Sequence, residues 1–332
     1  MTRGFGECVG EFALIDEGPR SASALADTGV SVLRWDRVQF QRALLRNPEV
    51  ARGVFRILTA KLRQDIAIHV DYAIEKERWR QDLQRAREIQ MGMLPHGDLK
   101  TEHASMSGFC QPAVEVGGDY YDFLSLDGDQ VDVVIGDVTG HGFYAGLFVA
   151  MAKSCLHTLQ TVDHSPASIM LAMRHTLSLS IQRRLLMSCF YVCIGLNCAT
   201  LTYANAGHPP PLVYPNAGHP PPLVYRHTSS QLELLGALDP ILGALDLENA
   251  CFQQQTVAWS SRDVLVIYTA GVIEERNADG RMFGEQRLES LIRDNAHLDA
   301  AQIKNAILES VSEHAGVVPQ SDDLTLAVVK AS

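Results

Sequence analysis

The sequence has no long apolar segment. A membrane-spanning helix needs about 18 consecutive apolar residues, and every apolar run in this chain is shorter. Its first residues, MTRGFGECVGEF, also lack the apolar core of a secretion signal. From these two absences we expect a cytoplasmic protein with no membrane segment.

A surplus of basic residues is absent as well. The 332 residues include 28 Lys and Arg against 39 Asp and Glu, which gives a net charge of -11. A negatively charged protein is repelled by phosphate backbones and by anionic lipid surfaces. The composition therefore argues against a nucleic-acid or membrane partner.

Cysteine patterns that are typical of zinc sites are also missing. The chain has seven Cys, an odd number, and no CxxC pair with a matching histidine spacing. We predict that these cysteines are buried free thiols.

What the sequence does contain is a set of acidic clusters beside apolar, β-branched runs. Asp119 and Asp122 lie in GGDYYDF, Asp137 lies in GDVTGHG, and Asp322 and Asp323 lie in SDDLTL. A single Asp at the end of a strand usually forms a turn or caps a helix. Several such carboxylates at one edge of a sheet would instead form a site of hard oxygen ligands, which suits Mg²⁺ or Mn²⁺.

The order of these motifs resembles a known family. The motifs follow one another along the chain as GGDYYDF, GDVTGHG, NAGHPPPL, YTAGVIEERN followed by FG, and SDDLTL. This series is similar to that of the SpoIIE/RsbU branch of PP2C-like (PPM) phosphatases, over about residues 85 to 330. The separation of strand runs from helix pairs independently indicates an α+β fold. The resemblance implies a two-layer antiparallel β-sandwich flanked by helices, with metals at one edge.

The resemblance also implies an activity, the metal-dependent hydrolysis of phosphoserine or phosphothreonine in a protein. Two Mg²⁺ or Mn²⁺ ions roughly 4 Å apart would hold the attacking water. By this resemblance Asp137 is the ligand that both metals share, with the Val138 carbonyl nearby, and Asp119 and Asp322 are ligands or water-mediated partners. The implied substrate is a phosphorylated bacterial signalling protein, of the anti-sigma-factor antagonist type.

Further residues carry over to supporting roles. His141 is a candidate for handling the leaving-group proton, although a histidine between two glycines also suits a simple turn. Asp122 and Asp323 are predicted to be second-shell or hydrogen-bonding groups and not ligands.

One position departs from the family pattern. Relatives typically read YTDG where this chain has YTAG, so Ala270 stands in place of a metal-binding carboxylate. Two hypotheses follow, a phosphatase with weakened metal binding or a catalytically silent signalling module that binds its partner without hydrolysing it.

The N-terminal segment resembles part of another domain. GECVGEFALIDEGPRSASALA is similar to the phosphate-binding cassette of cyclic-nucleotide-binding domains, where Glu11 would contact the ribose and Arg20 the cyclic phosphate. The segment VSVLRW would be the closing strand, and helices would follow from Asp36 to about Asp65. Only about nine residues precede Gly10 and Glu11 of the cassette. We therefore expect residues 1–65 to be a truncated fragment, with cyclic-nucleotide binding only where the complete domain exists.

Residues 66–95 are expected to form a linker helix. Tyr72, Trp79, Leu83, Ala86 and Met93 follow a 4-3 spacing, which predicts a short coiled coil and a homodimer. The alternative is an amphipathic helix that packs on its own domain. Residues 96–332 would then be the phosphatase domain.

Periodicity predicts the main elements of that domain. The expected strands cover about 131–138, 188–206, 263–270 and 322–330, and the expected helices about 145–160, 166–184, 285–297 and 300–315. Asp299 with Gln302 suits a capping box, and Gly316 suits a helix end. The segment NAGHPPPLVY occurs twice, at 205–214 and 216–225, and the extra copy is expected to form an extended, polyproline-like loop.

Overall fold

The protein was analysed as a computed structural model, which forms two compact units, Met1–Trp79 and Arg80–Ser332. The structure describes residues 9–10, 23–95, 97–126, 130–140, 142–159, 165–180, 185–195, 199–208, 220–236, 239–243 and 251–332. No helix within these ranges is both long and apolar enough to cross a membrane.

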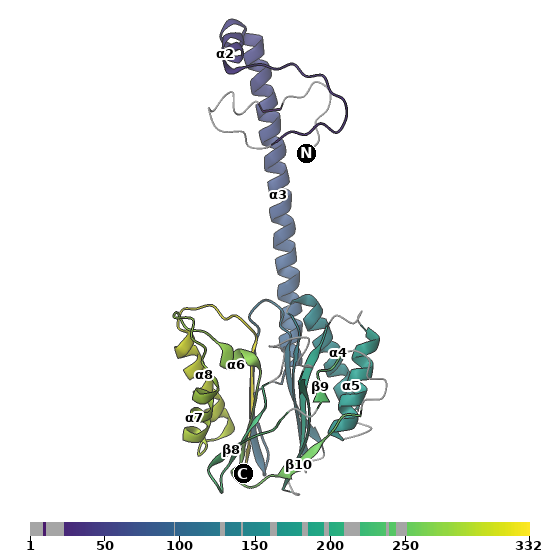
Figure 1. Ribbon diagram of the computed structural model, residues 1–332, viewed down its shortest axis with the longest axis vertical. Coiled ribbons are helices and arrows are strands. Elements are labelled where there is room, and N and C mark those ends of the chain that lie inside the picture. The colour runs from purple at the N-terminus through teal and green to yellow at the C-terminus, as the bar shows by residue number, and fades with distance from the viewer. Residues whose placement is uncertain are drawn as a thin grey trace. The chain divides into compact units, whose positions relative to one another are not determined.

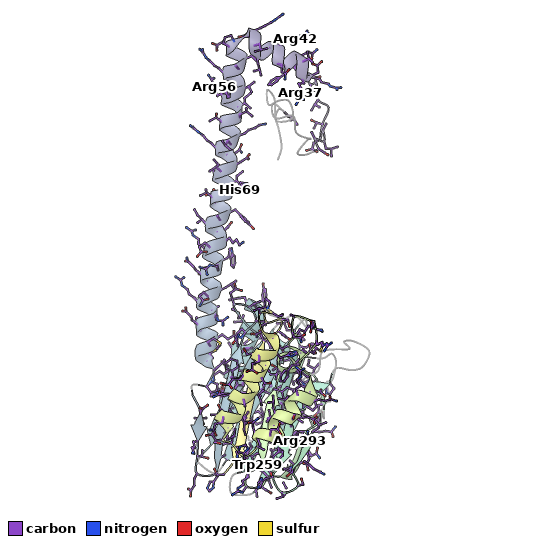
Figure 2. The ribbon with its side chains drawn as sticks, turned by 90° about the vertical axis from the view of Figure 1, so that its left-hand side faces the viewer. Arg37, Arg42, Arg56, His69, Trp259 and Arg293 are labelled. Atoms are coloured by element: carbon purple, nitrogen blue, oxygen red, sulfur yellow. The ribbon has the colours of Figure 1, made fainter. Side chains whose placement is uncertain are left out.

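Two helices dominate the described part of the first unit. Helix α2 (Arg37–Arg46) begins with a capping box between Asp36 and Gln39, and α3 (Pro48–Met93) runs for 46 residues. The side chains of α3, including Arg56 and His69, project outward from the helix (Figure 2). Many large apolar residues of α3 are therefore exposed to solvent.

The segment VSVLRW forms no strand, contrary to the sequence expectation. Residues 30–35 are irregular, and their apolar side chains are exposed. A strand needs a neighbouring strand to receive its backbone hydrogen bonds, and no strand lies in the described residues before position 99. The division of the chain at residues 65 and 95 stays a prediction.

The second unit contains two six-stranded β-sheets. The first sheet has the order β1 (Leu99–Lys100), β2 (Ala104–Gln111), β12 (Leu324–Ala331), β11 (Val264–Tyr268), β7 (Leu223–Arg226), β8 (Gln231–Leu234). The second has the order β10 (Gln255–Ala258), β6 (Thr200–His208), β5 (Met187–Gly195), β4 (Gln130–Val138), β3 (Asp119–Leu126), and β9 (Asp239–Pro240) joins β6. All pairings are antiparallel except that of β6 with β9.

Helices cover the outer faces of both sheets (Figure 1). Helices α4 (Phe143–Leu159) and α5 (Pro166–Ser180) pack on the sheet that contains β3 to β6. Helices α7 (Glu285–Asn295) and α8 (Ala300–Ala315) cover the sheet that contains β2 and β12, and the short α6 (Ala270–Glu274) follows β11. The predicted α+β sandwich with flanking helices is confirmed.

Strand β11 shows how the layers are held together. Leu265 and Ile267 belong to the core between the two sheets, whereas Val264, Val266 and Tyr268 belong to the core beneath α7 and α8. Successive side chains of a strand point to opposite faces, so a continuous apolar run can serve two cores.

Two local predictions for α8 are confirmed. Asp299 and Gln302 form the reciprocal capping box, and Gly316 ends the helix with a positive φ of 60°. The prediction for the cysteines holds only in part: Cys110, Cys189 and Cys193 are buried free thiols, whereas Cys155 is half-buried and Cys251 is exposed.

The duplicated segment contributes one strand from each copy. The first copy supplies the end of β6 and the second supplies Leu223–Tyr225 of β7, while 209–219, where the polyproline-like loop was expected, lie outside the described residues. The second copy is followed by Arg226, whose guanidinium lies 3.0 Å from buried Asp263 and 2.8 Å from Glu233. The first copy is followed by Pro215, which cannot form these ion pairs. Arg226 therefore explains why the second copy occupies β7.

Deletion of residues 209–219 should leave the fold intact, because the remaining chain reads NAGHPPPLVYR and still contains both strands. Loop length changes the free energy of folding only logarithmically, by about 0.6 kcal/mol per doubling. We expect the melting temperature to change by no more than about 3 °C, measured by calorimetry.

The matched control is Arg226→Ala in the full chain, which leaves buried Asp263 without its cation. It should cost about 3 to 5 kcal/mol. A deletion variant as unstable as this control would contradict the assignment of β7 to the second copy.

Candidate metal centre

The register of β3 against β4 places two carboxylates side by side. Asp119 is paired directly with Asp137 across the antiparallel strands. Directly opposed residues have Cβ atoms only about 4.5 to 5.5 Å apart, and like charges at this position repel each other. This pairing needs a compensating interaction at the edge of the sheet.

The loop before β3 is fixed to the start of β12 by Asp323. Its Oδ1 accepts a hydrogen bond from Ala113 N at 2.8 Å, and its Oδ2 accepts one from Gly118 N at 2.6 Å. A Cβ atom on Gly117 would lie 2.5 Å from Asp323 Oδ2, so this close approach requires glycine. Asp323 is therefore a hydrogen-bonding group that brings the two chain segments together.

Asp119 is buried and accepts a hydrogen bond from a threonine. Thr269 Oγ1 donates to Asp119 Oδ2 at 2.8 Å. Thr269 is the N-cap residue of α6, yet its side chain makes no capping hydrogen bond to that helix. Burial, followed by the charge of Asp137, holds the pKa of Asp119 well above its usual range.

Asp137 is half-buried at the end of β4. Burial, followed by the charges of Asp322 and Asp323, raises its pKa to about 7. Asp322 is exposed, and its Oδ1 accepts a hydrogen bond from Asp323 N at 2.8 Å. The carbonyl of Val138 faces Gly118, where a Cβ atom would lie 2.6 Å from the oxygen. The structure thus brings the predicted ligands to one edge.

Asp122 does not join this group. It lies three residues after Asp119 on β3, and side chains an odd number apart on a strand point to opposite faces. Its carboxylate contacts Lys153 and His157 of α4 on the outer face of the sheet. Asp122 therefore makes its contacts on the far side of the sheet from Asp119, and the second-shell role stays a prediction.

Three predicted site residues cannot be placed. His141, Glu11 and Arg20 lie outside the described residues. Their roles stay predictions that follow from the family resemblances.

Ala270 is the first residue of α6, directly after Thr269. The next residue, Gly271, packs against the backbone carbonyl of Asp323, so the start of α6 lies beside the Asp322–Asp323 segment. The side chain at position 270 is a methyl group with no oxygen to offer a cation. The position is therefore well placed for a ligand that this chain lacks.

Sequence reasoning missed a residue that supports the site from α3. Gln90 is buried, donates from Nε2 to Gly117 O at 2.8 Å, and accepts from Gly117 N at 3.1 Å through Oε1. Arg87 donates to Val114 O at 3.1 Å. One feature of the sequence could have indicated this role: Gln90 is a polar residue on the apolar seam of the predicted coiled coil. A buried amide needs specific hydrogen-bond partners.

The donor set suits a divalent cation only where water completes its coordination shell. Within the residues that the structure describes, no three acidic, histidine or cysteine side chains form a group that could hold a metal ion. Mg²⁺ usually keeps several waters and binds through only one or two carboxylates. The crowded carboxylates that raise the pKa of Asp137 are oxygen donors whose mutual repulsion such an ion would relieve.

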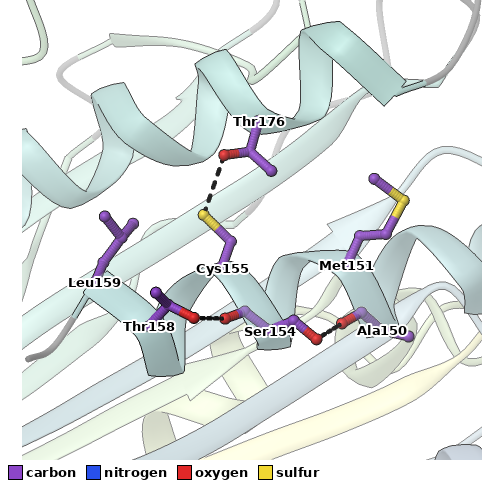
Figure 3. Close-up of a pocket in the computed structure, with 7 residues that line it drawn as sticks. All are labelled: Ala150, Met151, Ser154, Cys155, Thr158, Leu159 and Thr176. Atoms are coloured by element: carbon purple, nitrogen blue, oxygen red, sulfur yellow. Dashed lines mark hydrogen bonds between the residues drawn. The ribbon is translucent and has the colours of Figure 1, made fainter.

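A cavity of 520 Å³ lies elsewhere, between α4 and α5 (Figure 3). None of the acidic residues of the metal centre lines it. Its walls are mainly apolar side chains, with the Cys155 thiol 3.4 Å from Thr176 Oγ1. This cavity lacks charged groups and is not the candidate site.

Comparison with known families gives a match over most of the second unit. The family model described as Stage II sporulation protein E (SpoIIE) matches residues 127–216 and 212–332. The chain belongs to the SpoIIE family. The two matched stretches of this SpoIIE-family protein overlap inside the duplicated segment NAGHPPPLVY. An overlap there is expected when a family pattern with one copy of this segment is aligned with a chain that has two.

Individual relatives agree with this membership. The chain is 26% identical to phosphoserine phosphatase RsbP of Bacillus subtilis (strain 168) over 249 residues, which cover 74% of this chain and 56% of RsbP. It is 23% identical to phosphoserine phosphatase RsbU of the same organism over 300 residues, or 85% of this chain and 84% of RsbU. The chain thus spans little more than half the length of RsbP.

A solved structure shares the fold. The SiaA-PP2C domain of Pseudomonas aeruginosa superposes with a TM-score of 0.63 at 18% identity and covers 77% of this chain and 98% of that domain. The predicted PP2C-like architecture is confirmed by this similarity.

Proton competition at Asp137 provides a test of the site. Because its folded-state pKa of about 7 lies above the ordinary value of 3.8, the folded protein binds more protons than the unfolded chain between these values. This group therefore stabilises the metal-free protein at low pH, and its contribution is lost as the pH rises through about 7. A cation must displace the proton, so the stabilisation by Mn²⁺ should grow as the pH rises.

We expect the melting temperature of the metal-free protein to fall between pH 5 and 8, and Mn²⁺ to raise it more at pH 8 than at pH 5.5. Thermal denaturation with and without Mn²⁺ measures both effects. Asp137→Asn should flatten the pH dependence and reduce the Mn²⁺ response. An unchanged Mn²⁺ response in this variant would remove Asp137 from the site.

Proposed function

We propose that the chain is a metal-dependent protein phosphatase that hydrolyses phosphoserine or phosphothreonine on a bacterial signalling protein. The observation that carries the proposal is the convergence of Asp119, Asp137 and Asp322 at one sheet edge. Membership of the SpoIIE family and the names of RsbP and RsbU, both phosphoserine phosphatases, support it. The proposed substrate is a phosphorylated anti-sigma-factor antagonist.

The chemistry needs two Mg²⁺ or Mn²⁺ ions, which when bound supply a nucleophilic water at neutral pH and offset charge on the phosphoryl group. Asp137, with the Val138 carbonyl, is the proposed shared ligand. With a pKa of about 7, Asp137 loses its proton readily near neutral pH. Asp119 and Asp322 are the proposed ligands on either side of it.

Other residues of the chain orient these ligands. The hydroxyl of Thr269 holds the Oδ2 atom of Asp119. Asp323 fixes the loop that leads into β3, and Gln90 holds the same loop from α3. His141 is the proposed donor of a proton to the leaving serine or threonine oxygen.

Ala270 limits this activity in our proposal. A carboxylate at this position would lie beside Asp322, and the loss of even an outer partner commonly reduces metal affinity or activity about 10 to 100-fold. The enzyme would therefore need a high metal concentration. The alternative function, a silent module that binds a phosphorylated partner without hydrolysis, is favoured by this same residue.

Ala270→Asp should raise phosphatase activity at low Mn²⁺ by about 10 to 100-fold, because it restores a charged oxygen ligand. Release of phosphate from a phosphoserine protein over a Mn²⁺ titration measures the effect. Ala270→Asn is the matched control, since it has a similar size but no charge. The idea fails if wild type already equals Ala270→Asp at every Mn²⁺ concentration, and a wild type that stays inactive in excess Mn²⁺ favours the silent module.

Dimerisation through α3 is a further part of the proposal. Tyr72 and Trp79 follow the 4-3 spacing and are 67% and 66% exposed, so this part of the seam is open to solvent. A second copy of the helix would bury these side chains.

Trp79→Glu should convert the dimer to a monomer, because it places like charges opposite each other in the seam. Sedimentation velocity at micromolar concentration measures the change. Gln84→Glu adds the same charge at an exposed position off the seam and should leave the dimer intact. A wild-type protein that sediments as a monomer would rule out the proposed dimer.

A further inference from the structure

The outer face of β3 carries a buried polar cluster that contains none of the proposed metal ligands. Asp122 is 4% exposed, and its Oδ2 accepts hydrogen bonds from Tyr120 OH at 2.7 Å and from Lys153 Nζ at 2.6 Å. His157 Nε2 lies 3.0 Å from the same oxygen. The other oxygen, Oδ1, accepts from Phe123 N at 3.0 Å. Both carboxylate oxygens are therefore engaged, and we call this cluster the Asp122 clamp.

The clamp joins the strand of Asp119 to the helix that follows Asp137. Asp122 and Tyr120 belong to β3, whereas Lys153 and His157 belong to α4. The ammonium of Lys153 also lies 5.8 Å from the centre of the Tyr120 ring, within cation–π range. A buried carboxylate with a charged donor is a specific attachment, because a displaced helix would leave that charge unpaired.

Helix α4 is attached near its start as well. Gly142 N donates to Val116 O at 2.9 Å, just before the first turn of α4. Gly146 packs closely against the Val116 side chain and admits no Cβ atom there. The short segment between Asp137 and α4 is thus held between β4 on one side and this contact on the other.

Another side of α4 faces α5. An open groove of 520 Å³ runs along these two helices and is lined by Ser154, Cys155 and Thr158, among others (Figure 3). Phe148, Val149 and Leu156 of α4 are buried in the apolar core. The clamp adds a specific polar attachment to this apolar packing.

We propose that Asp122 is a positioning residue of the metal centre. By holding Lys153 and His157 it fixes α4, and with it residues 138–140 and Gly142, relative to Asp119 on the opposite face of the same strand. Its effect on metal binding and catalysis rests on the proposed function, whereas its effect on these backbone residues does not.

Hydrogen exchange of the metal-free full chain, followed by mass spectrometry, tests the structural part. Asp122→Asn removes the charge but keeps the size, and Lys153→Met removes the partner from α4. In both variants we expect amides of residues 138–147 to exchange about tenfold faster, while α7 and α8 stay unchanged. Glu309→Gln is the matched control, since it makes the same chemical change at an exposed site on α8.

Calorimetric titration with Mn²⁺ tests the link to the site without any turnover. Both variants should weaken Mn²⁺ binding about tenfold, the size of effect typical of residues that orient ligands. The double variant should be no worse than the poorer single variant, because both remove one interaction. In the assay of phosphate release, the loss should shrink at saturating Mn²⁺.

Variants with lower melting temperatures but wild-type exchange at 138–147 and wild-type Mn²⁺ affinity would overturn the proposal, because a purely stabilising contact gives that result. If Asp122→Asn fails to fold, the role of the clamp is decided with Lys153→Met and His157→Gln. Both of these residues are partly exposed, so their substitution disturbs the core less. A wild type that releases no phosphate would refute the proposed function, and the exchange comparison would still decide the role of the clamp.

Discussion

The pairing of β3 with β4 is the constraint on which the candidate site depends, because it sets Asp119 opposite Asp137. A slip of one residue in this register would turn Asp119 to the outer face and Asp122 to the inner one. The repulsion between the paired carboxylates is tolerated because Thr269 and Asp323 hold the surrounding chain from the other sheet. The acidic edge is therefore a product of contacts between the two sheets, not of one motif.

Much of the fold could be predicted from periodicity, but the faces of individual strands could not. The run 131–138 and the helix that begins after Asp299 were recognisable, because long apolar patterns and a capping box are local signals. The face on which Asp122 lies could not be read from GGDYYDF, because the opposite orientations of its two acids depend on where β3 begins. VSVLRW has a strand-like composition, yet a strand also needs partners, and composition does not provide them.

The acidic residues of the candidate site could be picked out from the sequence, whereas the residues that support them could not. Asp119, Asp137 and Asp322 stand out because they belong to an ordered series of acidic motifs beside apolar runs. Gln90 and Thr269 are ordinary residues in sequence, and their importance comes from what lies across from them in the folded chain. Residues that act by orienting others are defined by long-range contacts, so a single sequence contains little trace of them.

The pairing of Arg226 with Asp263 also has a practical consequence. Since β7 is anchored by a residue that follows the repeat, the connection from β6 to β7 holds eleven residues, from 209 to 219, that a single copy of the repeat would not need. An affinity tag or a fluorescent reporter peptide could replace those residues, which would label the second unit internally and leave both chain ends free.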